Sequence, residues 1–103
     1  KPENCILCDT KGVCYKGRTQ GMNEFKDRLA VDTDARTFEE ACVGADVLIG
    51  VSAPHVFENV LGVLNQKPII FAMSNPEPEV RPEIAKKIRP DCIIATGRSD
   101  YPN

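Results

Sequence analysis

Four short apolar runs are the feature that most constrains the fold of this chain. They cover residues 5–8, 46–51, 68–73 and 92–96. The runs are almost continuously apolar, whereas a strand with one face in water alternates apolar and polar residues. Continuous runs are typical of parallel strands that are covered on both faces. The pattern therefore predicts a parallel sheet with both faces buried.

Three stretches of helical character separate these runs. They cover residues 38–43, 56–64 and 82–88, and Gly, Pro or Asp follows each within a few residues. Thr37 precedes the first stretch at the spacing of a capping box with Glu40, and Pro82 suits a first helical turn. The predicted order of elements is β-α-β-α-β-α-β.

The stretch from Gly12 to Arg36 interrupts this order. It contains three glycines and shows little periodicity apart from Phe25 and Leu29, which are four residues apart. We expect an excursion with one short helix. No repeat or linker divides the chain, so residues 1–103 are expected to form one partial domain.

Length and charge exclude several classes of protein. A chain of 103 residues is about one domain or less. Its 13 basic and 15 acidic residues give a net charge of −2, which disfavours nucleic acid and anionic membranes as partners. The longest apolar run, residues 69–73, is far below the ~20 residues that span a bilayer. We expect a cytoplasmic or organelle-matrix location and, because the sequence does not begin with Met, a fragment of a longer chain.

Five cysteines are spread through apolar segments: Cys5, Cys8, Cys14, Cys42 and Cys92. An odd, scattered set favours reduced and buried thiols over a disulfide framework. Cys5 and Cys8 have the spacing of metal ligands, but residues three apart in a strand point to opposite faces. A shared metal is therefore not expected there.

Polar residues follow the apolar runs, at the edge where parallel sheets bind ligands. Asp9 follows the first run, and it either accepts hydrogen bonds from a ribose or forms a turn. Ser52 follows the second run, where it either faces a ligand or only connects strand to helix. Asn75 follows the third, where its amide either binds a ligand or closes an Asx turn. Beyond it, residues 77–89 alternate in charge and are expected to form a solvated face.

Several catalytic signatures are missing from the sequence. It has no G-x-G-x-x-G and no G-x-x-x-x-G-K-[ST] phosphate loop. It also lacks a Ser/His/Asp set and a metal-ligand cluster with suitable spacing. We therefore expect neither catalytic residues nor metal ligands within these residues.

Four collinear strings resemble the malic enzymes, and the bacterial-type branch fits best. The strings are residues 8–23 (beginning CDTKGVCYKGR), 44–52 (GADVLIGVS), 69–76 (IIFAMSNP) and 95–103 (ATGRSDYPN). The resemblance implies an enzyme that oxidises L-malate with NAD or NADP and Mg²⁺ or Mn²⁺. Decarboxylation of the bound oxaloacetate then gives pyruvate and carbon dioxide. It also implies a homo-oligomeric parent.

Within that family the chain would be the C-terminal part of the NAD(P)-binding domain. The implied fold is a partial Rossmann-type doubly wound parallel sheet that lacks its first β-α unit. The catalytic residues, metal ligands and Gly-rich turn of the family would lie outside the chain, which is expected to be inactive alone. Without that unit, the sheet is expected to have a gap beside the strand that ends at Val51.

The resemblance also assigns residues. Asp9 matches the acid that binds the adenosine ribose, Ser52 a strand-tip residue near the nicotinamide, and Asn75 an asparagine that contacts the nicotinamide ribose or the substrate. Lys11 and Lys26 are candidates to hold the 2′-phosphate of NADP, and NAD and NADP both stay open. The alternatives are a fragment of another two-domain dehydrogenase, of the amino-acid dehydrogenase type, and a free-standing binding module.

Overall fold

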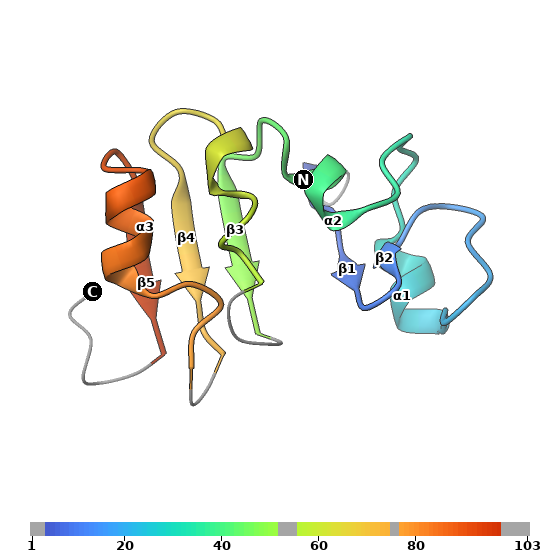
Figure 1. Cartoon of the computed structure of the whole chain (residues 1–103). Coiled ribbons are helices and arrows are strands. Elements are labelled where there is room, and N and C mark those ends of the chain that lie inside the picture. The colour runs from blue at the N-terminus through green and yellow to red at the C-terminus, as the bar shows by residue number, and fades with distance from the viewer. Residues whose placement is uncertain (1–3, 52–55, 75–76, 98–103) are drawn as a thin grey trace. The chain divides into compact units, whose positions relative to one another are not determined.

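The computed structural model describes residues 4–51, 56–74 and 77–97. The chain divides into two compact units, residues 1–41 and 42–103. Figure 1 shows the order of their elements along the chain. In the described part of the chain, no helix is long and apolar enough to cross a membrane.

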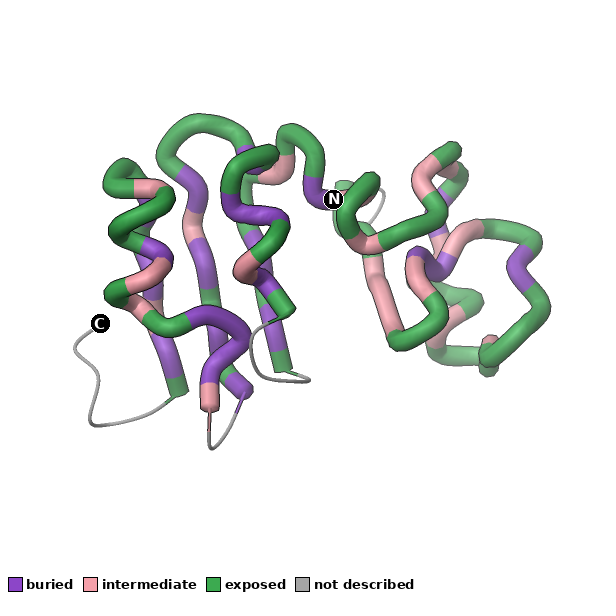
Figure 2. The backbone as a smooth tube through the Cα atoms, in the orientation of Figure 1, coloured by how far each residue is buried: buried purple, intermediate pink, exposed green. Residues whose placement is uncertain are grey.

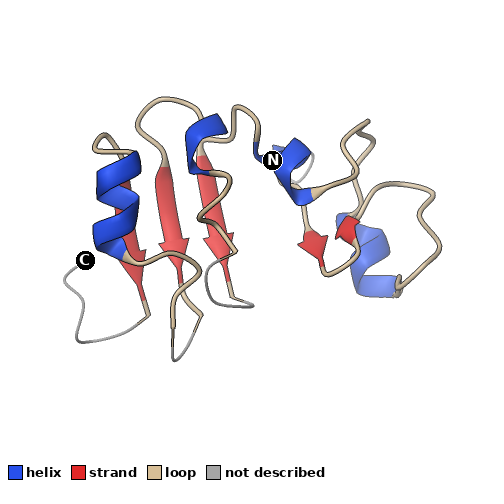
Figure 3. Ribbon diagram, in the orientation of Figure 1, coloured by secondary structure: helices blue, strands red, loops and turns tan. Residues whose placement is uncertain are grey.

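The second unit is built on a parallel sheet. Its strands are β3 (Val47–Gly50), β4 (Ile69–Ala72) and β5 (Ile93–Thr96), which pair in the order β3-β4-β5 (Figure 3). The register places Gly50 opposite Ala72 and Ala72 opposite Thr96, so the three strands end at one level. Three of the four predicted strands are therefore confirmed as members of a parallel sheet.

Only one face of this sheet carries the described helices. The α-helix α3 (Pro82–Ile88) and the 3-10 helix η2 (Leu61–Val63) contact each other and lie on the same side of the sheet (Figure 1). Leu48, Ile70 and Ile94 point into the core on the covered side and are at most 7% exposed.

The prediction that both faces are buried is wrong for the described residues. Burial alternates along all three strands (Figure 2). Large apolar side chains on the second face, Val47, Ile49, Phe71 and Ile93, are 38–70% exposed. An apolar run shows that a face suits burial, but a second layer must be present to bury it.

The predicted helix over residues 56–64 is also wrong in most of its length. Residues 56–60 form turns, and only Leu61–Val63 is helical, as a 3-10 turn. Three valines and Gly62 lower the helix propensity of this stretch. Phe57, Val60 and Leu64 are nevertheless buried, so the helical spacing of apolar residues found a core without forming an α-helix.

The first unit begins with a hairpin where a parallel strand was predicted. The strand β1 is Cys8–Asp9 and pairs antiparallel with β2, Gly12–Val13. The prediction of a parallel strand over residues 5–8 is therefore wrong. The chain reverses directly after Asp9, and Gly12 has a φ of +107°, a conformation that favours glycine.

Two short helices follow the hairpin. The predicted helix of the excursion is α1 (Glu24–Leu29), where the Asn23 side chain accepts the Lys26 N–H at 2.9 Å. The helix α2 (Phe38–Cys42) confirms the first predicted helical stretch. Its capping box is complete, because Thr37 Oγ1 accepts the Glu40 N–H and Glu40 Oε1 accepts the Thr37 N–H, both at 3.1 Å.

Three of the five cysteines are buried. Cys14, Cys42 and Cys92 are buried, as predicted, whereas Cys8 is half-buried and Cys5 is exposed. Burial raises the pKa of the Cys8 thiol to about 11.

We predict that Thr37→Ala lowers the free energy of unfolding of the chain by about 1 kcal/mol, because the first turn of α2 loses its side-chain acceptor. Urea unfolding followed by circular dichroism measures this change. Thr19→Ala is the matched control, since Thr19 is exposed outside any helix or strand. Equal effects of the two substitutions would contradict a stabilising capping box.

Candidate functional site

Asp9 ends β1 and closes the turn that follows. Its Oδ1 accepts the backbone N–H of Lys11 at 2.9 Å, so the turn-forming interpretation of Asp9 is confirmed. The same carboxylate also forms ion pairs with the side chains of Arg18 and Lys26, and the residue is only partly exposed. Turn formation and cation binding thus occur at one carboxylate.

Arg18 is the main partner of Asp9. Its Nη2 lies 3.0 Å from Asp9 Oδ1 and 2.7 Å from Oδ2. The other guanidinium nitrogens donate to carbonyls: Nη1 to Val13 O at 3.0 Å and Nε to Gln20 O at 2.9 Å. The side chain is 5% exposed. Arg18 therefore uses its donors to hold the loop against Asp9.

Lys26 reaches the same carboxylate from α1. Its Nζ lies 2.8 Å from Asp9 Oδ2 and 2.9 Å from the carbonyl oxygen of Gly21. The Lys26 side chain is 29% exposed, so it is more accessible than the Arg18 side chain, which is 5% exposed. Lys11 is exposed on the turn. The structure thus brings together three predicted site residues, Asp9, Lys11 and Lys26.

Asp9, Arg18 and Lys26 form the Asp9 cluster, which carries two positive charges and one negative charge. Hydrogen bonds from Arg18, with a further contribution from Lys26, hold the pKa of Asp9 well below its usual range. Burial raises the pKa of the Cys14 thiol, whose Sγ lies 3.4 Å from Arg18 Nη1, so this thiol is neutral near pH 7. Two basic side chains, Arg18 and Lys26, are therefore paired with one carboxylate.

Sequence reasoning missed Arg18. It lies in the glycine-containing excursion, between Gly17 and Gly21, and both glycines have positive φ. Glycines spaced in this way allow the loop to curl around a side chain, so they were the available signal. That signal did not identify which residue the loop encloses.

The other two predicted site residues, Ser52 and Asn75, lie outside the described residues. The strand ends before them are described: the Met73 N–H donates to Gly50 O at 2.9 Å, so the ends of β3 and β4 lie side by side.

The solvated face predicted for residues 77–89 is wrong at Glu79. This side chain is 0% exposed, and its Oε1 accepts the Ser74 N–H at 3.0 Å. Pro78 and Val80 on either side are also buried, which draws the segment into the core despite its alternating charges.

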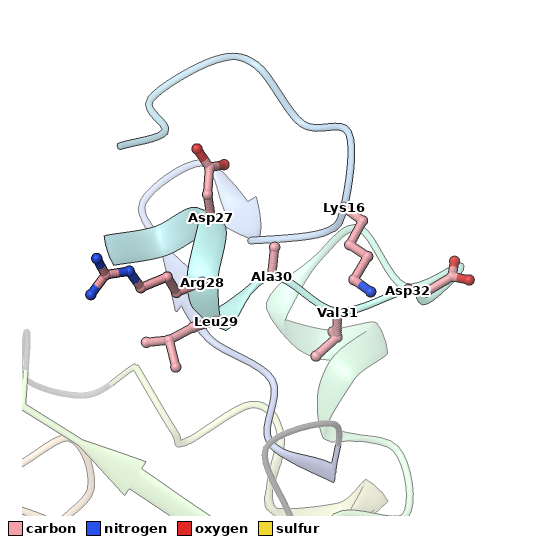
Figure 4. Close-up of a pocket in the computed structure, with 7 residues that line it drawn as sticks. All are labelled: Lys16, Asp27, Arg28, Leu29, Ala30, Val31 and Asp32. Carbon is pink, nitrogen blue, oxygen red and sulfur yellow. The ribbon is translucent and has the colours of Figure 1, made fainter. Parts of the chain in front are cut away.

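A separate pocket lies in the first unit. Its volume is about 350 Å³, and it is lined by Lys16 and residues 27–32 (Figure 4). Two acidic and two basic side chains line it, so the charges of the pocket favour neither an anionic nor a cationic ligand. Among the described residues, no three His, Cys, Asp or Glu side chains gather in a way that could hold a metal ion.

Comparison with known proteins gives a consistent result. No family model matches the chain. The "NADP-dependent malic enzyme" of Rhizobium meliloti is 58% identical over 103 residues, which are 99% of this chain and 14% of that protein. The "Probable NADP-dependent malic enzyme" of Rickettsia prowazekii is 58% identical over 99 residues, 95% of this chain and 13% of that protein. The chain corresponds to a segment of the malic enzymes.

An NAD-dependent relative and a solved structure also match this malic-enzyme segment. The "NAD-dependent malic enzyme" of Rhizobium meliloti is 44% identical over 98% of the chain and 13% of that protein. A crystal structure of the NAD-dependent malic enzyme from Thermotoga maritima matches 98% of the chain with a TM-score of 0.85 and 34% identity, and the match covers 28% of that chain. The segment thus spans about a seventh of the length of these three curated relatives, which include enzymes named for either cofactor.

We predict that Asp9→Asn lowers stability at neutral pH and that its difference from the wild type narrows as the pH falls below about 4. A carboxylate whose pKa is lowered by folding stabilises the folded state above its ordinary pKa of about 3.9, and this contribution is lost in acid. Urea unfolding of the malic-enzyme segment between pH 3 and 7 measures the difference. Asp34→Asn, at an exposed position, is the control. A difference that stays constant with pH would contradict the argument.

Proposed function

We propose that this segment is part of the NAD(P)-binding domain of a malic enzyme, within a partial doubly wound sheet. The observation that carries the proposal is the collinear identity with malic enzymes, 58% over 103 residues. The parallel order of β3, β4 and β5 supports it, because open parallel sheets bind ligands at the carboxyl ends of their strands. The names of the relatives favour a malic enzyme over an amino-acid dehydrogenase.

The reaction of the whole enzyme would be the oxidation and decarboxylation of L-malate to pyruvate and carbon dioxide, with reduction of NAD or NADP. The metal ligands and the catalytic acid and base would come from other parts of the enzyme. The described residues of this segment would contribute to cofactor binding, and the segment alone would be inactive.

The test is an assay of the full-length polypeptide that carries this segment. We expect L-malate-dependent reduction of NADP or NAD with Mg²⁺ or Mn²⁺, and no turnover by the 103-residue chain alone. Measurement of absorbance at the nicotinamide band, together with pyruvate, detects the reaction. Oxidation of an amino acid instead of malate by the full-length protein would contradict the proposal.

For the cofactor, the charges around Asp9 favour NADP. Both oxygens of Asp9 already accept hydrogen bonds, from Lys11 N, Arg18 and Lys26. A bare ribose hydroxyl would have to displace one of these donors. A 2′-phosphate could instead take the Lys26 ammonium, the more exposed of the two paired cations, while Arg18 keeps the Asp9 turn in place.

We predict that Lys26→Met in the full-length enzyme lowers the preference for NADP over NAD by about 10- to 100-fold, the loss expected for one charge-assisted hydrogen bond of ~1.5–3 kcal/mol. The ratio of kcat/KM for the two cofactors measures it, and kcat/KM with NAD is expected to change little.

Lys16→Met is the matched control, because Lys16 lines the separate pocket of Figure 4. An unchanged cofactor ratio in Lys26→Met, or an equal change in both variants, would contradict the assignment of Lys26 to the 2′-phosphate.

A further inference from the structure

Glu79 is a buried acidic residue that is not among the residues proposed above to bind the cofactor. It is 0% exposed, and the neighbouring Val80 is also 0% exposed. Burial of a carboxylate is costly unless hydrogen bonds compensate it, so an apolar residue would fill this space at lower cost. The contacts of the Glu79 side chain should therefore explain why an acidic residue occupies this buried position.

The Glu79 carboxylate contacts the end of β4. Its Oε1 accepts the backbone N–H of Ser74, two residues beyond the last residue of the strand, at 3.0 Å. Ser74 is itself buried, so water does not compete for its N–H. The bond fixes the backbone where β4 ends.

The same carboxylate lies against the end of β3. A Cβ atom on Gly50, the last residue of β3, would overlap the Glu79 carboxyl group and would lie 2.7 Å from Phe57 Cζ. Gly50 therefore has to be glycine for the carboxylate to pack there. The Glu79 backbone takes part as well, since its carbonyl oxygen accepts the Phe57 N–H at 3.1 Å.

We propose that Glu79 is a positioning residue that sets the strand ends of β3 and β4 for the cofactor and substrate. This inference rests on the proposed function. In open parallel sheets the carboxyl ends of the strands carry the ligand, and Glu79 bridges two of these ends within the second unit. Displacement of such an end by about 1 Å can cost on the order of 10²-fold in rate.

Two conservative variants separate the position of the acceptor from the chemical group that carries it. Glu79→Gln replaces the carboxyl group by an amide but keeps an Oε1 that can accept the Ser74 N–H. Glu79→Asp keeps the carboxyl group but is one methylene shorter, so the acceptor no longer reaches. In the full-length enzyme we expect Glu79→Asp to lower kcat by about 10- to 100-fold. KM for malate should change less, and Glu79→Gln should stay within about threefold of the wild type.

Glu83→Asp is the matched control, because Glu83 is exposed in the first turn of α3. An unaltered kcat in Glu79→Asp, or an equal loss in Glu79→Asp and Glu79→Gln, would overturn the positioning role.

A second measurement uses the full-length protein and does not depend on activity. Hydrogen exchange of the Ser74 amide should be faster in Glu79→Asp than in Glu79→Gln, since only the aspartate variant loses the acceptor. Equal exchange would count against the proposal. If the wild-type full-length protein does not oxidise malate, the proposed function fails, and the exchange comparison still decides whether Glu79 holds the end of β4.

Discussion

The parallel ladder of β3, β4 and β5 is the constraint on which the second unit depends. Its register brings Gly50, Ala72 and Thr96 to one level, so the three chain segments that follow start from a common edge. A slip of one residue would exchange the buried and exposed faces of a strand. The burial of Leu48, Ile70 and Ile94, which lie opposite one another, fixes that register on the covered face.

The first unit depends on a different kind of interaction, a group of charged side chains beside the small apolar core of Val13, Cys14 and Val31. Asp9 closes its own turn and also anchors Arg18, whose other donors hold the carbonyl groups of the surrounding loop. A loop with few buried apolar side chains acquires a defined shape when one buried guanidinium satisfies several carbonyl groups at once. The cluster is therefore both structural support and the source of positive charge.

The sequence was sufficient where local chemistry decides the outcome. The Thr37–Glu40 capping box and three of the four predicted parallel strands followed from short-range patterns, and the structure confirms them. The failures needed information from distant residues. No local pattern shows that Arg18 will curl back to Asp9, or that Glu79 in a run of alternating charges will be buried against Gly50. These are tertiary contacts, set by which segments pack together.

The two cations of the Asp9 cluster differ in depth, at 5% and 29% exposure for Arg18 and Lys26. Dissolved ions screen exposed pairs much more than buried ones, with a Debye length of about 8 Å at physiological ionic strength. Rising ionic strength thus loosens the Lys26–Asp9 pair first and leaves the Arg18–Asp9 pair in place. The Asp9 turn keeps its shape because Arg18 stays paired, while the Lys26 ammonium group is released from Asp9. Arg18 thus maintains the geometry of the turn, and Lys26 supplies a charge that responds to ionic strength.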